Sequence, residues 1–166
     1  MKKKLAYIVA TYFGCGLSKF APGTCGSLGT LPLAYILLHL WGVCALIIAA
    51  VICFILGVWA TKIVVDDCHI SDPSKVVIDE TVGQLLTFSL VAFVAPDHLD
   101  GMYSLFYYAL GFGFFRFFDI LKMGPVKYAD TKINNEYGVM LDDVFAGIFA
   151  AVLLLATIYG LDFFNI

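Results

Sequence analysis

Five apolar stretches constrain the fold of this chain more than any other feature. They cover residues 28–41, 43–64, 84–95, 102–118 and 144–160. A helix needs about 17 or more apolar residues to cross roughly 30 Å of hydrocarbon, and the second, fourth and fifth stretches approach or exceed that length. The first and third are nearer to about 12–14 residues, which also fits a buried core helix or a re-entrant segment. The pattern predicts an all-α, polytopic membrane protein of about five hydrophobic helices.

Composition agrees with this prediction. Hydrophobic residues make up 61% of the chain and charged residues 14%, against roughly half and a quarter in soluble domains. The net charge of −3 provides no basic field for nucleic acid, so that class of partner is excluded. The five cysteines have no metal-ligand spacing and are expected to be reduced structural thiols. No linker or repeat divides the sequence, and residues 1–166 are expected to form a single domain.

The positions of the basic residues predict how the helices cross the membrane. All of them lie before the first stretch, from the end of the second to the third, or from the end of the fourth to the fifth: Lys2, Lys3, Lys4, Lys19, Lys62, Lys75, Arg116, Lys122, Lys127 and Lys132. Because Lys and Arg accumulate in cytoplasmic loops, this alternation predicts five crossings, with the N-terminus in the cytoplasm and the C-terminus outside. Most acidic residues share these loops, so we expect a polar site on the cytoplasmic face.

Residues 14–28 are rich in glycine and small hydroxyl side chains just before the first apolar stretch. Thr24 and Ser27 would lie beside a helix N-terminus, where free N–H groups and the helix dipole favour phosphate. We therefore predict that these two residues bind phosphate. The alternative is an N-cap combined with small-residue contacts between helices. The Walker A spacing of nucleotide-binding loops is missing.

Two acidic residues, Asp79 and Glu80, stand between apolar neighbours ahead of the third stretch. If residues 76–82 extend that helix, both carboxylates lie inside it near the membrane face, where acids are usually functional. Asp72 precedes a proline and a serine, and its sequence favours a structural role as a turn or helix cap.

The third basic connection contains Arg116, Asp119 and Lys122, which repeat every three residues. On one helix, Arg116 and Lys122 could each pair with Asp119 or jointly bind a phosphate, although a salt-bridged helix end is the alternative. Asp142 and Asp143 precede the fifth stretch, where helix capping would account for one of them.

These residue types together indicate metal-assisted phosphoryl chemistry. Carboxylates without a His or Cys cluster suit Mg²⁺, and the expected ligands are Asp79, Glu80, Asp119, Asp142 and Asp143. The expected phosphate-binding residues are Thr24, Ser27, Arg116 and Lys122. A carboxylate would orient or deprotonate a water while the cations stabilise developing charge, which makes Asp79, Asp119, Asp142 and Asp143 the candidate catalytic residues.

Four ordered blocks resemble the phosphatidylglycerophosphatase A family. They are Gly14-x-Gly-Leu-Ser with Ala21-Pro-Gly-Thr-x-Gly-Ser-Leu28, Asp72-Pro-Ser with Val77-Ile-Asp-Glu-x-x-Gly83, Phe115-Arg-x-Phe-Asp-Ile-x-Lys122, and Gly138-x-Met-Leu-Asp-Asp-Val-x-Ala-Gly147. The resemblance implies a Mg²⁺-dependent phosphoric monoester hydrolase of the bacterial inner membrane. Its substrate would be the phospholipid phosphatidylglycerophosphate, converted to phosphatidylglycerol.

Two departures from the family pattern leave other substrates open. Met123-Gly124 stands where the family usually has proline after Lys122, and Asn134-Asn-Glu-Tyr137 replaces a glycine-rich segment. A phosphatase or phosphotransferase acting on another lipid phosphate is one alternative. A small transporter or ion-binding membrane protein is another, although its acids should lie near mid-membrane. A purely structural subunit would tolerate Asn at Asp79, Asp119 and Asp142.

Overall fold

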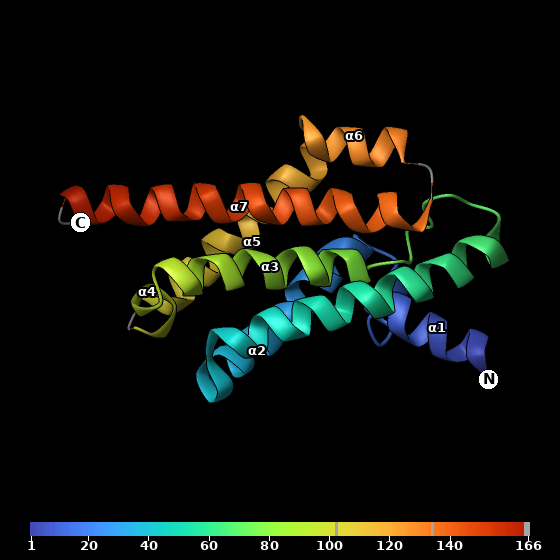
Figure 1. Ribbon diagram of the computed structural model, residues 1–166, viewed down its shortest axis with the longest axis horizontal. Helices are drawn as coiled ribbons and strands as arrows, with labels where there is room; N and C mark the ends of the chain where they lie inside the picture. The colour runs from blue at the N-terminus through green and yellow to red at the C-terminus, as the bar shows by residue number, and fades with distance from the viewer. Residues whose placement is uncertain (102, 134, 165–166) are drawn as a thin grey trace.

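A computed structural model shows a helical bundle and describes residues 1–101, 103–133 and 135–164 (Figure 1). In chain order the helices are α1 (Lys2–Ala10), α2 (Pro22–Cys68), α3 (Ile78–Val94), α4 (Asp97–Asp100), α5 (Ser104–Leu121), α6 (Pro125–Lys132) and α7 (Glu136–Phe164), with a 3-10 turn, η1 (Cys15–Leu17), before α2. No strand occurs in these described ranges, so the all-α prediction is confirmed. The first residue of the fourth apolar stretch, one residue of the second family departure and the last two residues lie outside the described residues: Met102, Asn134, Asn165 and Ile166.

α2 is a helical hairpin that contains the first two apolar stretches. Its backbone breaks at Gly42, with φ 74° and ψ −173°, a conformation that is essentially restricted to glycine. Gly26 in the first arm and Gly57 in the second both lie against the start of α3, so the chain reverses at the break. Figure 1 shows this reversal at the end of the bundle opposite the N-terminus.

The helices are longer than the apolar stretches alone suggest. The first arm of α2 starts at Pro22 rather than at residue 28, and residues 22–41 span about 30 Å at 1.5 Å per residue. α2, α5 and α7 are long and apolar enough to cross a membrane, which agrees with the prediction for the second, fourth and fifth stretches. Together with the apolar surface, these helices make the chain a membrane-associated protein.

α3 lies at the centre of the bundle and packs against both α2 and α7. Leu85, Phe88 and Val91 are fully buried in a core that also takes in Leu46 of α2 and Leu154 of α7. α3 starts at Ile78, so Asp79 and Glu80 fall in its first turn as the extended-helix prediction required. Because neighbouring helices enclose α3, its 17 residues need not match the full hydrocarbon thickness.

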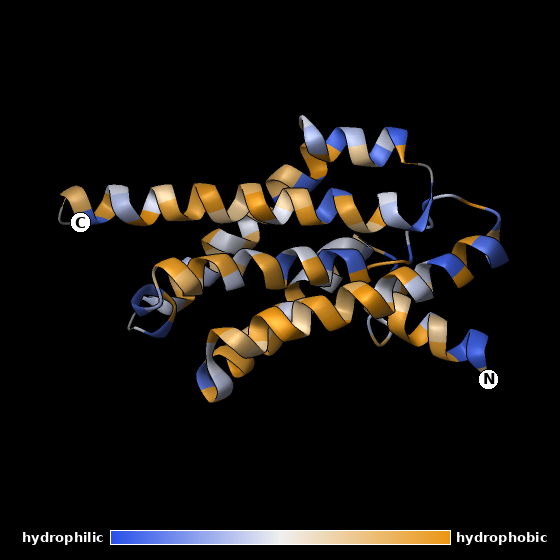
Figure 2. Ribbon diagram, viewed as in Figure 1, coloured by the Kyte–Doolittle hydropathy of each residue, from blue (hydrophilic) through white to orange (hydrophobic). Residues whose placement is uncertain are grey.

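Charged side chains collect at one end of the bundle, which we call the basic end. The start of α1, both ends of the α2 hairpin, the starts of α3 and α7, the end of α5 and all of α6 meet there (Figure 1). Figure 2 shows hydrophilic residues at this end and hydrophobic residues along the middle of the helices. At the opposite end, His39 pairs with Asp100 at 2.8 Å and His98 with Asp162 at 3.3 Å.

Candidate active site

A pocket of about 290 Å³ opens at the basic end, between the first turns of α2 and α3, the last turn of α5 and the second turn of α7. It brings together residues from all four family-like blocks: Ala21, Pro22, Gly23, Asp72, Ser74, Val76, Asp79, Glu80, Arg116, Asp119, Ile120, Lys122, Asp142 and Asp143. Every acidic residue expected from the sequence as a catalytic group or metal ligand therefore faces one cavity.

Two glycines allow α3 and α7 to approach closely beside this pocket. A Cβ placed on Gly147 would lie 2.5 Å from the carbonyl oxygen of Gly83, and a Cβ on Gly83 would lie 2.5 Å from the carbonyl oxygen of Asp143. Thr87 stabilises the contact between the two helices, because its hydroxyl donates to the carbonyl oxygens of Gly83 at 2.9 Å and Gly147 at 3.2 Å. Small residues at such crossings let helix backbones touch. The contact fixes Asp143 opposite the first turn of α3.

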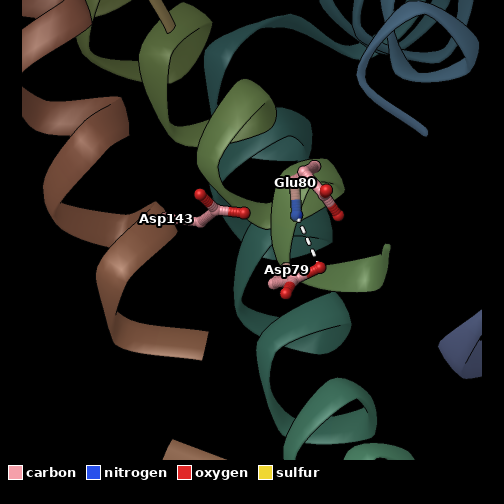
Figure 3. Close-up of side chains that lie close together, drawn as sticks. All are labelled: Asp79, Glu80 and Asp143. Atoms are coloured by element: carbon pink, nitrogen blue, oxygen red, sulfur yellow. Dashed lines mark hydrogen bonds between the residues drawn. The ribbon is translucent and has the colours of Figure 1, made fainter. Parts of the chain in front are cut away.

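Asp79, Glu80 and Asp143 form a group that we call the carboxylate cluster. Figure 3 shows Asp143 reaching from α7 toward the two α3 residues. One oxygen from each carboxylate lies within 4.8 Å of the others. Asp79 Oδ1 accepts a hydrogen bond from the backbone N–H of Glu80 at 3.0 Å. Glu80 Oε2 and Asp143 Oδ1 are buried without a hydrogen-bond partner among the described residues, so the cluster retains free acceptors.

The carboxylate cluster fits a hard divalent cation. Three buried or half-buried carboxylates cannot remain ionised together without a compensating positive charge. Oxygens bound to one Mg²⁺ at about 2.1 Å are separated by at most roughly 4.2 Å, so the observed spread requires only a small contraction. The donor set, which contains oxygens alone, is also the type that Mg²⁺ prefers.

Arg116 lies on the α5 side of the pocket and joins three elements. Its Nη1 lies 2.5 Å from Asp119 Oδ2 and 3.8 Å from Glu80 Oε1, and it donates to Ser27 Oγ at 3.4 Å. The Nε atom is buried and has no partner among the described residues. The expected Arg116–Asp119 pair is thus present, and Arg116 also keeps a donor for a further anion.

Lys122 does not join that pair, because α5 ends at Leu121 and Lys122 adopts a left-handed conformation with φ 44°. Its ammonium instead donates to Asp142 Oδ2 at 2.8 Å and to Asp130 of α6. Burial alone lowers the pKa of Lys122, but the hydrogen bonds to the two carboxylates outweigh it and hold the pKa above its usual value. Lys122 is therefore a fixed positive charge on the pocket wall.

The first block is α-helical from Pro22 onward, before the apolar stretch begins at residue 28. α2 starts at Pro22, and its first N–H to bond within the helix is that of Cys25, which donates to Ala21. This leaves the N–H groups of Gly23 and Thr24 without an intrahelical acceptor. A Cβ on Gly23 would collide with Glu80 Oε1 and lie 3.2 Å from Arg116 Nη1. A larger residue at this position would displace the ends of these two charged side chains.

The two hydroxyl residues of that block differ in position. Ser27 is buried one turn inside α2, where it accepts from Arg116 and donates to the carbonyl of Gly23 at 2.9 Å. The side chain of Thr24 is not among the groups that line the pocket. The structure therefore brings Arg116 and Lys122 to the cavity, whereas neither Ser27, which contacts Arg116, nor Thr24 lines it.

The start of α7 also differs from expectation. The helix begins at Glu136, so Asp142 and Asp143 lie in its second turn and cap nothing. Asp142 pairs with Lys122, and Asp143 joins the carboxylate cluster. Capping therefore accounts for neither acid, and both side chains are available to the pocket.

Two acids in or beside the pocket were missed or misread from the sequence. Asp72, which its neighbours suggested to be a turn or cap residue, lies at the mouth of the pocket, where desolvation raises its pKa above the usual value although the side chain stays partly accessible. Asp130 lies on α6, a short polar helix with no apolar signal, and binds Lys122. For Asp72, the Asp72-Pro-Ser block of the family pattern was the one sequence signal that could have identified it as a residue of the pocket.

Comparisons of the sequence with known proteins identify the family. The model of the family described as phosphatidylglycerophosphatase A matches residues 8–158. The chain belongs to the phosphatidylglycerophosphatase A family. It is 37% identical to phosphatidylglycerophosphatase A of Haemophilus influenzae over 92% of this chain and 88% of the relative. It is 32% identical to the protein of that name from Escherichia coli, over 89% and 80% of the two chains. No solved structure matches significantly.

A third relative in the family comparison has a different name. A Bacteroides thetaiotaomicron protein provisionally named phosphatidylinositol-3-phosphatase is 36% identical over 90% of this chain and 91% of its own length. Met123-Gly124, the expected departure from the family pattern, lies beside the pocket between α5 and α6. Gly124 adopts φ 56° immediately before α6, the helix that carries Asp130 to Lys122.

Proposed function

We propose that this protein hydrolyses the terminal phosphate of phosphatidylglycerophosphate to give phosphatidylglycerol, with Mg²⁺ bound at the carboxylate cluster. The observation that carries the proposal is the pocket itself, in which three clustered carboxylates face Arg116 and Lys122 at one end of an apolar bundle. Family membership supports a lipid phosphatase, and the position of the pocket supports a substrate that is held at a membrane surface.

Positive groups on three sides of the pocket would bind the phosphate. Arg116 offers a planar guanidinium with an unpaired donor, and Lys122 a point charge. The N–H groups of Gly23 and Thr24 add the N-terminal dipole of α2. These groups would also stabilise the charge that spreads over the phosphate oxygens as the ester bond breaks.

Asp79, Glu80 and Asp143 would hold the Mg²⁺, which when bound would neutralise phosphate charge. Asp119 and Asp142 are instead paired with Arg116 and Lys122. An ionised carboxylate facing the phosphate can hold the attacking water and accept its proton. We therefore assign the carboxylate cluster to metal binding. Asp119 and Asp142 are assigned to positioning the attacking water, Arg116 and Lys122.

The distribution of charge supports a cytoplasmic orientation for the pocket. The lysines and Arg116 lie in or beside the segments that meet at the basic end, which the positive-inside rule places in the cytoplasm. The protein would then be a multi-pass protein of the bacterial inner membrane with five crossings, two of them in the α2 hairpin. Labelling of an engineered cysteine at Asp97 from outside intact cells, and of one at Lys127 only after permeabilisation, would verify this orientation.

Phosphate release from phosphatidylglycerophosphate by the detergent-purified protein tests the reaction. We expect release with Mg²⁺, none with EDTA, and a loss of at least about a hundredfold in Asp119→Asn. Asp97→Asn is the matched control, because it removes an exposed carboxylate from the opposite end of the bundle. No release from the folded wild-type protein would refute the assigned substrate.

A phosphatase acting on phosphatidylinositol 3-phosphate is the second candidate, supported by the name of the Bacteroides relative. The same pocket would carry out the same phosphoryl chemistry with a bulkier alcohol as leaving group. Measuring kcat/KM for both lipids under one set of conditions separates the two functions, since the physiological substrate should have the higher value.

A further inference from the structure

An apolar groove of about 390 Å³ lies between the first arm of α2 and α5, away from the pocket; we call it the acyl groove. Its walls include Leu31, Pro32 and Tyr35 from α2, and Leu105, Tyr108 and Ala109 from α5. This volume lies within the range of small-molecule sites. The groove offers an elongated apolar ligand a defined place on the bundle.

The acyl groove follows the same helix seam as the active-site pocket. Ser27 and Arg116 meet across this seam at 3.4 Å. Leu31 lies one helical turn beyond Ser27 on α2, and Ala109 lies about 10 Å from Arg116 along α5 at 1.5 Å per residue. A molecule bound to Arg116 that extends along the seam toward the opposite end of the bundle therefore enters the groove.

One wall of the groove is rigid and the other is accessible. The Tyr108 ring is 4% exposed and packs on Phe88, with ring centroids 4.5 Å apart. The rings of Tyr35 and Tyr108 lie 5.8 Å apart across the seam. Leu105 is 79% exposed, so the groove is open along its side and a lipid chain could enter laterally from the bilayer.

We propose that the acyl groove binds a fatty acyl chain of the phosphorylated lipid whose headgroup occupies the pocket. The inference rests on the proposed function, because it takes the substrate to be a membrane lipid with its phosphate at Arg116. Chains of a bilayer lipid run roughly parallel to membrane-crossing helices, and the groove lies between two helices of that length and hydropathy. A longer chain buries more apolar surface in the groove than a short one, so the groove favours long-chain lipids.

Labelling with a photoreactive lipid tests the groove without requiring turnover. The wild-type protein would be irradiated in EDTA with phosphatidylglycerophosphate that carries a diazirine near the end of one acyl chain. We expect the label in residues 31–36 and 104–109, displaced by unlabelled dipalmitoyl lipid but not by the dioctanoyl form. A label spread evenly over other exposed helix surfaces such as α7 would overturn the proposal.

A kinetic comparison measures selectivity with a matched pair of variants. Ala109→Trp fills the groove, and Val152→Trp places the same ring at a site on α7 that is 59% exposed. For Ala109→Trp we expect KM for the dipalmitoyl substrate to rise about tenfold, equivalent to losing contact with roughly two methylene groups. In the same variant, KM for the dioctanoyl substrate should change less than about twofold. In Val152→Trp, KM for either substrate should also change less than about twofold.

The outcomes separate this inference from the proposed function. Equal changes for the two chain lengths in Ala109→Trp would refute the groove while leaving the phosphatase intact. Wild-type protein that cleaves neither substrate would refute the proposed function, and the labelling result alone would then decide whether the groove binds an acyl chain.

Discussion

A Cβ placed on Gly147 would lie 2.5 Å from the carbonyl oxygen of Gly83, so α3 and α7 are in backbone contact one turn from the carboxylate cluster. This contact sets the distance between Asp143 on one helix and Asp79 and Glu80 on the other. The position of the cluster therefore depends on two residues that carry no side chain.

Gly147→Ala should separate α3 from α7 and reduce activity. The added methyl group meets backbone, which cannot move aside as a flexible side chain can, and overpacking of this kind costs about 1–3 kcal/mol. We expect a lower unfolding temperature in detergent and at least about a tenfold fall in kcat/KM, because small displacements of catalytic groups are costly. Gly160→Ala on the same helix meets nothing within 4 Å and should retain full activity.

Asp143→Asn should weaken Mg²⁺ binding more than it alters the fold. The change preserves side-chain shape but removes one negative charge from the carboxylate cluster. The Mg²⁺ concentration for half-maximal activity should rise at least about tenfold, with Asp97→Asn as control. An unchanged Mg²⁺ dependence would contradict the assignment of this residue as a ligand.

Arg116→Lys should impair catalysis although the charge is kept. In the structure Nη1 alone contacts Asp119, Glu80 and Ser27, and lysine would lose the Nε donor that remains available for the phosphate. We expect kcat/KM to fall at least about tenfold. Lys127→Met, which removes an exposed charge from α6, should change kcat/KM little. An equal fall in kcat/KM for Lys127→Met and Arg116→Lys would contradict a specific role of Arg116.

Asp130→Asn tests a contact that the sequence did not suggest. Lys122 would lose one carboxylate partner and keep Asp142 at 2.8 Å. Because this pair is partly exposed, we expect a fall in kcat/KM of roughly fivefold at most. Asp142→Asn should be clearly more harmful, since Asp142 lines the pocket directly. The reverse order would show that Asp130 has a direct role.

Gly42→Ala should destabilise the protein without a direct effect on the site. Gly42 has φ 74° and ψ −173° at the far end of the bundle, and an alanine there would cost about 1–3 kcal/mol. Thermal unfolding in detergent should show the loss, while kcat/KM of the folded fraction stays near that of the wild type. Gly113→Ala, at an open position in α5, is the control and should not destabilise the fold.

The sequence by itself determined the class of fold and the end of the molecule that carries the site. Hydropathy depends on local composition, so the apolar stretches predicted α2, α5 and α7 as long membrane helices, and the spacing of Lys and Arg predicted their grouping at one end. The four family-like blocks identified most of the charged residues that face the pocket.

Only the tertiary structure decided how these residues are paired. The sequence could not separate Asp79, Glu80 and Asp143, which form the carboxylate cluster, from Asp119 and Asp142, which pair with Arg116 and Lys122. That division follows from the close crossing of α3 with α7 and from the end of α5 at Leu121. Contacts between distant segments depend on the three-dimensional packing of helices, and nothing in the local composition around a carboxylate records which cation will lie beside it.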